Sequence, residues 1–222
     1  MPRVARVDVG GNAYHVINRA VMRFEIFSAE EDYRLFEDLL ETSAEETGMR
    51  ILAYTLMPNH WHLLLHPVED GDLGLFMHQL TNSHTRRVHS RTGTIGNGPV
   101  YQGRYKSFLI QDDTHLLTVL KYIERNPIRA NLSSRAEEWR WGSAWRRIHG
   151  TAQQKKLLAP PPVPLPTNYV SWINTGEPSE ELKSIRASVN KGTPFGKESW
   201  KEKMAVQFNL GPTLRNPGRP KK

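Results

Sequence analysis

The amino-acid sequence predicts an α+β fold, in which a central antiparallel or mixed β-sheet is flanked by helices and followed by a C-terminal extension. Short β-favouring runs alternate with longer segments whose apolar residues recur at helical spacing. Two of the short runs, 50–57 and 60–66, are separated only by a Pro-Asn pair, which indicates an antiparallel hairpin. Strands that are separated by helices and include one hairpin are typical of α+β domains.

The residues before this hairpin predict one strand and one helix. Residues 13–19, AYHVINR, follow a Gly-Gly pair and favour a strand. Ser28 followed by Glu31 is a capping-box pattern, and the apolar residues after it keep helical spacing as far as Gly48. We therefore expect an amphipathic helix between the first strand and the hairpin.

Two further helices and one strand are predicted after the hairpin. Helical spacing over about 73–91 indicates a helix, which a glycine-rich stretch ends, and the run VYQGRYKSFLI at 100–110 predicts a strand. Asp112 or Asp113 can cap a third helix, HLLTVLKYIER. That helix must finish near Asn126, because the following proline disfavours helical geometry at the residue before it.

The composition changes after about residue 150, which divides the chain into two parts. Residues 1–150 carry all the elements named above, and a chain of 222 residues needs only one such domain plus an extension. The part 151–222 contains a proline-rich spacer at 159–166, a weak helix around 178–190 and a basic tail. We expect this part to be an accessory extension that is packed or draped on the main domain.

The composition favours a cytosolic protein with an anionic partner. Hydrophobic residues make up 38% of the chain and charged residues 24%, and no apolar run approaches the roughly 20 residues that span a bilayer. The first residues lack the apolar core of a secretory signal, and the absence of cysteine excludes disulfides and thiolate metal sites. The formal charge of +7 favours a nucleic acid or another anionic surface, and composition alone leaves DNA, RNA and membrane surfaces open.

The first candidate site is the pair His60 and His62 on the predicted strand 60–66. Side chains alternate along a strand, so both imidazoles project to one face while Trp61 projects to the other. Two imidazoles suit zinc, manganese and similar ions, yet they do not close a tetrahedral structural site. Open positions would remain for phosphate oxygens. The alternative is that both histidines are ordinary surface or hydrogen-bonded residues.

The second candidate site is Tyr122 with Asn126, which are four residues apart and therefore share one face of the third helix. A divalent ion held by the two histidines and the Asn126 oxygen could polarise a phosphodiester for attack by the phenol. This interpretation requires the helix to face the histidines. The alternatives are a core tyrosine and an asparagine that only ends the helix.

These residues carry a resemblance to a known family. The segment MPNHWHLLLHP, followed further along by YIERNPIRANL, resembles the single-tyrosine transposases of the HUH nuclease superfamily. The opening MPRVARVDVGGNAYHVINR, the run VYQGRYKSFLI and the ending with GTPFGKESW and LRNPGRPKK resemble the transposases associated with repetitive extragenic palindromes (REP elements). The resemblance implies a ferredoxin-like HUH nuclease fold, a 5′-phosphotyrosine intermediate on Tyr122, and Mg²⁺ or Mn²⁺ bound by His60 and His62. Asn126 would stand where the wider superfamily has a glutamine or histidine ligand.

The resemblance further implies a sequence-specific single-stranded DNA endonuclease and transposase that cleaves and rejoins palindromic hairpins. Such a protein would be cytoplasmic and associated with the nucleoid. We expect a monomer, and a dimer stays open because related insertion-sequence enzymes can pair one subunit's tyrosine with the other's histidines. The alternatives are a non-catalytic regulatory protein that binds hairpin DNA, and a hydrolase that uses metal-activated water. No carboxylate accompanies the two histidines as an obvious general base for the hydrolase.

Several basic residues are candidates for contacts to DNA phosphates or bases, because arginine and lysine supply most such contacts. They are Arg3, Arg6, Arg19, Arg86, Arg87, Arg104, Lys106, Arg129 and Arg219. Tyr101 and Tyr105 could stack on unpaired bases, with ordinary strand packing as the favoured alternative for both.

Overall fold

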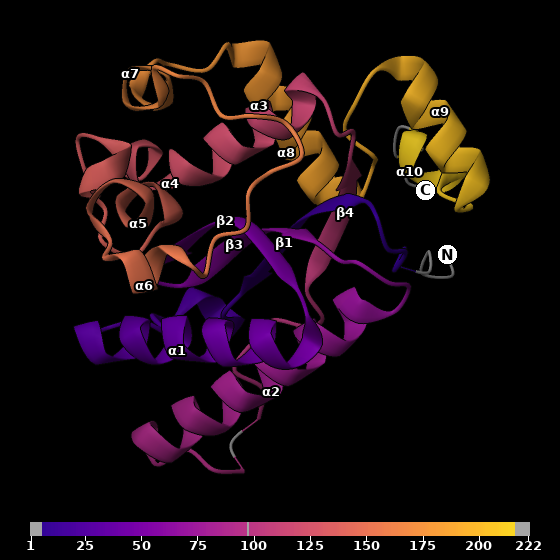
Figure 1. Ribbon diagram of the computed structural model, residues 1–222. Helices are drawn as coiled ribbons and strands as arrows, with labels where there is room; N and C mark the ends of the chain where they lie inside the picture. Colours follow the sequence, from indigo (N-terminus) through magenta and orange to yellow (C-terminus); the bar gives the residue numbers. More distant parts are fainter. Residues whose placement is uncertain (1–5, 97, 216–222) are drawn as a thin grey trace, which may run out of the picture.

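The computed structural model describes residues 6–96 and 98–215, and one four-stranded antiparallel sheet lies at their centre (Figure 1). The strand order is β2-β3-β1-β4, and all three pairings are antiparallel. The strands are β1 (Ala13–Arg19), β2 (Arg50–Met57), β3 (His60–His66) and β4 (Lys106–Ile110). The predicted strand 13–19 and the predicted hairpin are confirmed, and Met57 pairs with His60 across the Pro-Asn turn.

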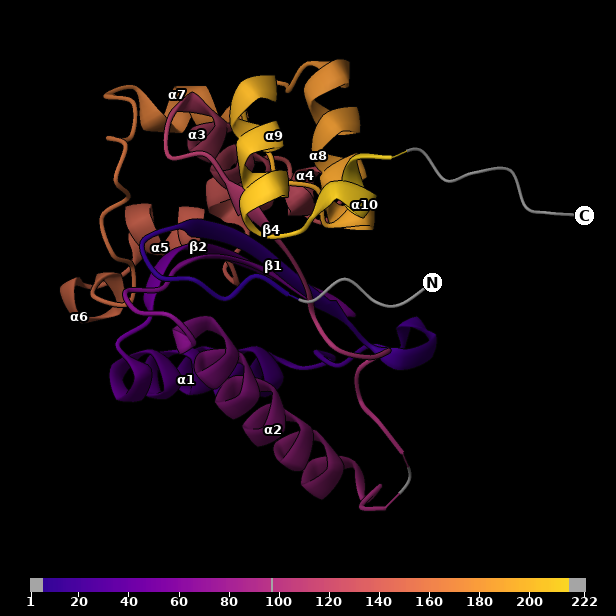
Figure 2. The ribbon, with the colours of Figure 1, turned by 90° about the vertical axis from the view of Figure 1, so that its right-hand side faces the viewer.

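Two long helices cover one face of the sheet, and most of the remaining helices gather on the other (Figure 2). The chain order β1-α1-β2-β3-α2-β4 is the split βαβ arrangement of ferredoxin-like folds. The covering pair is α1 (Glu30–Thr47) and α2 (Asp72–Thr92). The other helices are η1 (Val21–Arg23), α3 (Thr114–Glu124), α4 (Asn126–Arg129), η2 (Ala136–Glu138), α5 (Ser143–His149), α6 (Ala152–Lys155), α7 (Tyr169–Asn174), α8 (Ser179–Lys191), α9 (Glu198–Gln207) and α10 (Gly211–Leu214).

The alternation of side chains along the strands separates two hydrophobic cores. On β3, Trp61 and Leu63 are fully buried in the core beneath α1 and α2. Leu64 faces the other way and packs with Leu120 and Ile123 of α3 in the second core. The helix that carries Tyr122 therefore covers the face of the sheet to which the even-numbered residues of β3 point.

The beginnings of two elements differ from the predictions. The N-cap of α1 is Ala29, one residue after the predicted cap Ser28, and the Asp32 carboxylate accepts hydrogen bonds from the backbone N–H groups of Ser28 (2.8 Å) and Ala29 (3.0 Å). The predicted strand 100–110 is wrong in its first half, since β4 begins only at Lys106. Tyr101 forms only an isolated β-bridge with Ala20, and its hydroxyl accepts a hydrogen bond from the Trp61 indole in the core.

The extension packs against the sheet through both backbone and side chains. The N–H of Phe195 donates to the carbonyl of Leu109 at 2.8 Å, and the carbonyl of Phe195 accepts from Gln111 at 2.9 Å. Phe195 and Ile185 of α8 are also buried in the second core, beside α3. The predicted helix around 178–190 is present as α8. The extension therefore contributes to the packing of the helix that carries Tyr122.

Within residues 6–96 and 98–215, no helix is both long enough and apolar enough to cross a membrane.

Candidate functional site

Three histidines from two adjacent strands meet on the α3 face of the sheet. His60 and His62 project from β3, with ring centroids 5.1 Å apart. His15 projects from β1 and lies beside His62, with its Nε2 atom 2.8 Å from Nδ1 of His62. Ile17 is the residue paired with His62 in the register, so His15 reaches His62 diagonally across the two strands.

The hydrogen bond of His60 leaves one ring nitrogen free for a ligand. Nδ1 of His60 lies 2.7 Å from the side-chain oxygen of Asn59. That oxygen can only accept, while the Asn59 amide nitrogen donates to the carbonyl of Arg23 at 3.3 Å. His60 therefore carries its proton on Nδ1 and presents the lone pair of Nε2, which is the form of imidazole that binds a metal ion.

Burial keeps these histidines uncharged. Burial is the main cause that lowers the pKa of His60 to about 4, and the nearby Arg19 adds to it. Burial likewise lowers the pKa of His15 to about 3. The pKa of His62 is lowered well below its usual value by burial and by neighbouring His15, His60, Arg129 and Arg19. Neutral imidazoles are available to ligate a cation at neutral pH.

The same pKa shifts predict that the protein loses stability in mild acid. The unfolded chain takes up protons on these histidines below a pKa of about 6.5, whereas the folded protein does not until about pH 4 or lower. Stability is therefore fully present above that window and falls as the pH drops through it. Between pH 7 and pH 5 each such histidine removes roughly 2 kcal/mol from the free energy of unfolding. Urea unfolding at several pH values measures this loss.

A matched variant for this experiment is His84→Gln, far from the candidate site. Burial also lowers the pKa of His84 to about 3, and its Nδ1 lies 2.7 Å from the Tyr101 hydroxyl under the opposite face of the sheet. The free energy of unfolding of this variant should still fall with pH. The number of protons taken up on unfolding, which the slope against pH gives, should be smaller by about one. A free energy of unfolding that does not change between pH 7 and pH 5 would contradict the prediction.

Tyr122 lies against the histidines, on the same face of the sheet. Its ring centroid is 6.0 Å from that of His62 and 6.1 Å from that of His15, in both cases edge to face. The side chain is 7% exposed, and no hydrogen bond involves its hydroxyl within the described residues. The structure thus brings the predicted tyrosine and histidines together within one subunit.

Buried polar contacts fix the helix that carries Tyr122. The Thr55 hydroxyl of β2 donates to the carbonyl of Ile123 at 2.9 Å. The Glu124 carboxylate is 1% exposed, and it accepts from the hydroxyls of Ser143 and Tyr169, each at 2.6 Å. Tyr169 belongs to the extension, so residues from both parts of the chain hold α3 in place.

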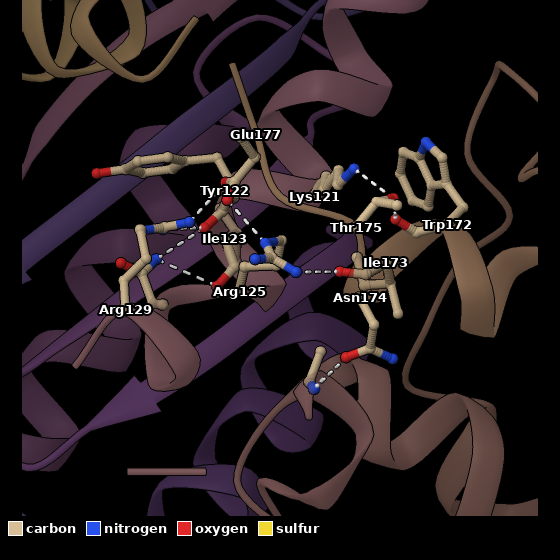
Figure 3. Close-up of polar contacts among 12 residues, drawn as sticks. Lys121, Tyr122, Ile123, Arg125, Arg129, Trp172, Ile173, Asn174, Thr175 and Glu177 are labelled. Carbon is tan, nitrogen blue, oxygen red and sulfur yellow. Dashed lines mark hydrogen bonds and ion pairs between the residues drawn. The ribbon is translucent and has the colours of Figure 1, made fainter. Parts of the chain in front are cut away.

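A second contact from the extension holds Arg129 against the tyrosine (Figure 3). The Glu177 carboxylate accepts from Nε of Arg125 at 2.7 Å and from Nη1 of Arg129 at 2.5 Å, and its side chain is 4% exposed. The guanidinium of Arg129 lies 4.2 Å from the centre of the Tyr122 ring and donates to the Tyr122 carbonyl. Any contact between Arg129 and DNA therefore competes with Glu177 and Tyr122.

Asn126 lies at the start of α4, one turn after the tyrosine. Its amide nitrogen donates to the carbonyls of Tyr122 (3.2 Å) and Ile123 (3.1 Å) in the last turn of α3. Within the described residues, no three His, Asp or Glu side chains are grouped to hold a metal ion. A cation here would depend on His60 and His62 with a neutral oxygen ligand, and the role of Asn126 stays a prediction.

Comparisons with known proteins decide the family. The family model described as "Transposase IS200 like" matches residues 9–126, more than half of the chain. The chain belongs to the IS200-like transposase family. Membership of a transposase family implies an enzyme. The match includes the two strands that carry His15, His60 and His62, as well as the helix that carries Tyr122.

Two relatives are more specific than the family model. A Haemophilus influenzae protein with the provisional name REP-associated tyrosine transposase is 23% identical over 121 residues, which are 51% of this chain and 69% of that protein. The solved structure of a REP-associated tyrosine transposase bound to a REP hairpin is similar with a TM-score of 0.59 and 14% identity. That match covers 80% of this chain and 93% of the other chain. At this identity the likeness shows the fold.

In this IS200-like transposase, three of the predicted DNA contacts line one cavity. Arg6, Arg104 and Lys106 line a cavity of about 370 Å³ between β4 and the extension. Phe108 also lines this cavity, and its ring centroid is 5.0 Å from that of His15. Arg6 and Arg104 also line a groove of about 560 Å³ along α2. The guanidinium of Arg6 lies 3.9 Å from the centre of the half-buried Tyr105 ring.

The other predicted DNA contacts have different surroundings. Arg19 pairs with His60 in the register at the end of β1, so it belongs to the site. Arg86 and Arg87 are exposed on α2, which covers the opposite face of the sheet from the histidines. Arg3 and Arg219 lie outside the described residues.

Of the two tyrosines considered for base stacking, Tyr101 is a core residue. It is 7% exposed and accepts a hydrogen bond from the Trp61 indole at 3.0 Å, as the packing alternative predicts. Tyr105 borders both cavities, beneath Arg6. Tyr101 borders the groove along α2 as well, but its hydroxyl is bonded within the core, and the stacking role of Tyr105 stays a prediction.

Proposed function

We propose that the chain is a sequence-specific single-stranded DNA endonuclease and strand transferase that cleaves and rejoins palindromic hairpins through a phosphotyrosine on Tyr122. The observation that supports this most is the packing of the Tyr122 ring against His62, on the face of the sheet that also presents His60. A phenol beside two neutral imidazoles combines a nucleophile with ligands for a cation. Neither the fold nor the packing of α3 requires this combination.

The residues present fit a divalent cation, Mg²⁺ or Mn²⁺. His60 presents its Nε2 lone pair because Asn59 holds the proton on Nδ1. His62 is neutral and lies beside it, and the Asn126 oxygen is the proposed third ligand. When bound, the cation supplies a Lewis acid that neutralises the phosphodiester and orients it for in-line attack. All three protein ligands are neutral, so they leave the charge of the cation to the substrate.

In the proposed step the phenolic oxygen of Tyr122 forms a bond to phosphorus, and the bond from phosphorus to the 3′ oxygen breaks. The phenolic proton passes to water, and the 3′ oxygen takes up a proton to become a hydroxyl. The 5′ phosphate stays on the tyrosine, and attack by another 3′ hydroxyl reverses the step and rejoins the strand. The Arg129 guanidinium, 4.2 Å from the ring centre, stabilises negative charge as it develops on the phenol.

Hairpin DNA is the proposed substrate class for two reasons. The solved relative of the same fold is bound to a REP hairpin. The chain carries a formal charge of +7, and Arg6, Arg104 and Lys106 line a cavity that shares Phe108 with the surroundings of the site. A folded stem can contact such cations through its phosphates while its unpaired flank enters the site.

The proposal predicts a covalent complex between protein and DNA. We expect hairpin oligonucleotides with randomised single-stranded flanks and a 3′ label to give a labelled protein band under denaturing conditions when Mn²⁺ or Mg²⁺ is present. Chelation with EDTA should abolish the band. Tight binding without cleavage under either ion would favour the non-catalytic regulatory protein, and cleavage without the labelled band would favour a hydrolase that uses water.

A further inference from the structure

We propose that His15 is a positioning residue for the cation site. Its Nε2 atom accepts a hydrogen bond from the Nδ1–H group of His62 and thereby leaves the Nε2 lone pair of His62 to the cation. The inference rests on the proposed function, because it assigns a hydrogen-bond partner to one of the proposed cation ligands. It concerns the placement of a proton within a neutral pair, so the net charge of the pair does not change.

The geometry of the two rings defines a single strong hydrogen bond. Nε2 of His15 and Nδ1 of His62 are 2.8 Å apart, and the two ring planes are within 2° of parallel. The residues are 0% and 2% exposed, so water does not compete for either nitrogen. At this distance one nitrogen donates and the other accepts.

Only one direction of this hydrogen bond is compatible with a cation on His62. A neutral imidazole carries one proton. If His15 were the donor, the proton of His62 would sit on Nε2, and that nitrogen could not bind a metal ion. If His62 is the donor, its Nε2 lone pair is free. His15 must then be the acceptor and must carry its own proton on Nδ1.

The rest of the His15 ring has no partner that would oppose this arrangement. Its Nδ1 atom is buried and makes no hydrogen bond within the described residues. The aromatic rings nearest to it are those of Phe108 (5.0 Å between centroids) and Tyr122 (6.1 Å), in addition to His62. His15 can therefore accept from His62 without breaking another contact. In His60 the Asn59 side-chain oxygen accepts the hydrogen bond from Nδ1–H in the same way.

Nitrogen NMR of the full-length protein tests the proton positions directly. Long-range proton–nitrogen spectra of ¹⁵N-histidine-labelled protein distinguish the Nδ1-protonated form of a ring from the Nε2-protonated form. With Zn²⁺ as the diamagnetic probe, we expect Nδ1-protonated rings for His60, His62 and His15, and metal-induced shifts of Nε2 for His60 and His62 alone. An Nε2-protonated His15 in the zinc-bound protein would overturn the proposal.

Affinity measurements on variants test the energetic consequence. Replacing His15 by Phe keeps a ring of similar size and removes the acceptor, so Zn²⁺ and Mn²⁺ should bind about 10–100-fold more weakly. His15→Gln restores an accepting oxygen and should recover part of that loss. His84→Phe alters an equally buried histidine on the other face of the sheet and should leave the affinity unchanged. Equal affinity of His15→Phe and wild type would refute the role of His15.

These outcomes separate the proposal from the proposed function. If wild-type protein binds neither ion and the His60 signals do not shift, the cation site itself is wrong and both proposals fail. If His60 and His62 bind the ion while His15→Phe binds it equally well, only the role of His15 fails.

Discussion

Tyr122→Phe should abolish the covalent complex with DNA and lower cleavage by at least about a thousandfold, because the phenolic oxygen is the atom that attacks phosphorus. The loss should be confined to chemistry. The ring contacts to His62 and His15 do not need the hydroxyl, and within the described residues that hydroxyl makes no hydrogen bond that the variant could break. DNA affinity and the urea midpoint should therefore match those of the wild type. Gel-shift titration measures DNA affinity, denaturing gels measure the covalent complex, and urea titration gives the unfolding midpoint.

Tyr33→Phe is the matched control, since it removes the same atom from an equally buried tyrosine on α1, which covers the opposite face of the sheet. Its covalent complex should form at nearly the wild-type rate. Cleavage that survives in Tyr122→Phe would refute the tyrosine nucleophile and point to attack by water. If both variants lost cleavage equally, the loss in Tyr122→Phe could no longer be assigned to its missing nucleophilic oxygen.

The sequence predicts the site where local rules determine it. Alternation along a strand places His60 and His62 on one face, and spacing on a helix places Tyr122 and Asn126 on one side. The cap at Asp113 and the proline after Asn126 define where that helix begins and ends, and the structure confirms both boundaries to within a few residues. These rules cannot show which face of the sheet the helix covers.

The residues that the sequence analysis misses act through tertiary contacts. His15 lies in a predicted strand, but its contact with His62 follows from the register between β1 and β3. Glu177 lies in the extension, beyond the proline-rich spacer, and nothing in its sequence neighbourhood indicates that it would meet Arg129. The strand predicted to start at residue 100 fails for a similar reason. Tyr101 has strand propensity, but its hydroxyl bonds to Trp61 and His84 in the core.

The contact between Glu177 and the tyrosine helix leads to the largest effect on stability that we expect from a single substitution. Glu177→Gln keeps the size of the side chain and removes the charge that pairs with Arg125 and Arg129, whose side chains are 9% and 16% exposed. Two largely buried guanidinium groups would lose their common carboxylate. Breaking a buried pair in this way costs about 3–5 kcal/mol, so the free energy of unfolding should fall by that amount. Urea titration followed by tryptophan fluorescence measures it.

Glu180→Gln makes the same substitution three residues later, in an ion pair with Lys183 whose side chains are 80% and 69% exposed. Its cost should stay below about 1 kcal/mol, because solvent screens such a pair. Two further variants, Arg129→Met and its combination with Glu177→Gln, separate the two arginines. If Glu177 acts on the tyrosine through Arg129, the losses in the rate of covalent-complex formation should be less than additive. Strictly additive rate losses would show that Glu177 does not act on the tyrosine through Arg129. Equal free energies of unfolding for Glu177→Gln and Glu180→Gln would show that the ion pairs of Glu177 do not stabilise the tyrosine helix.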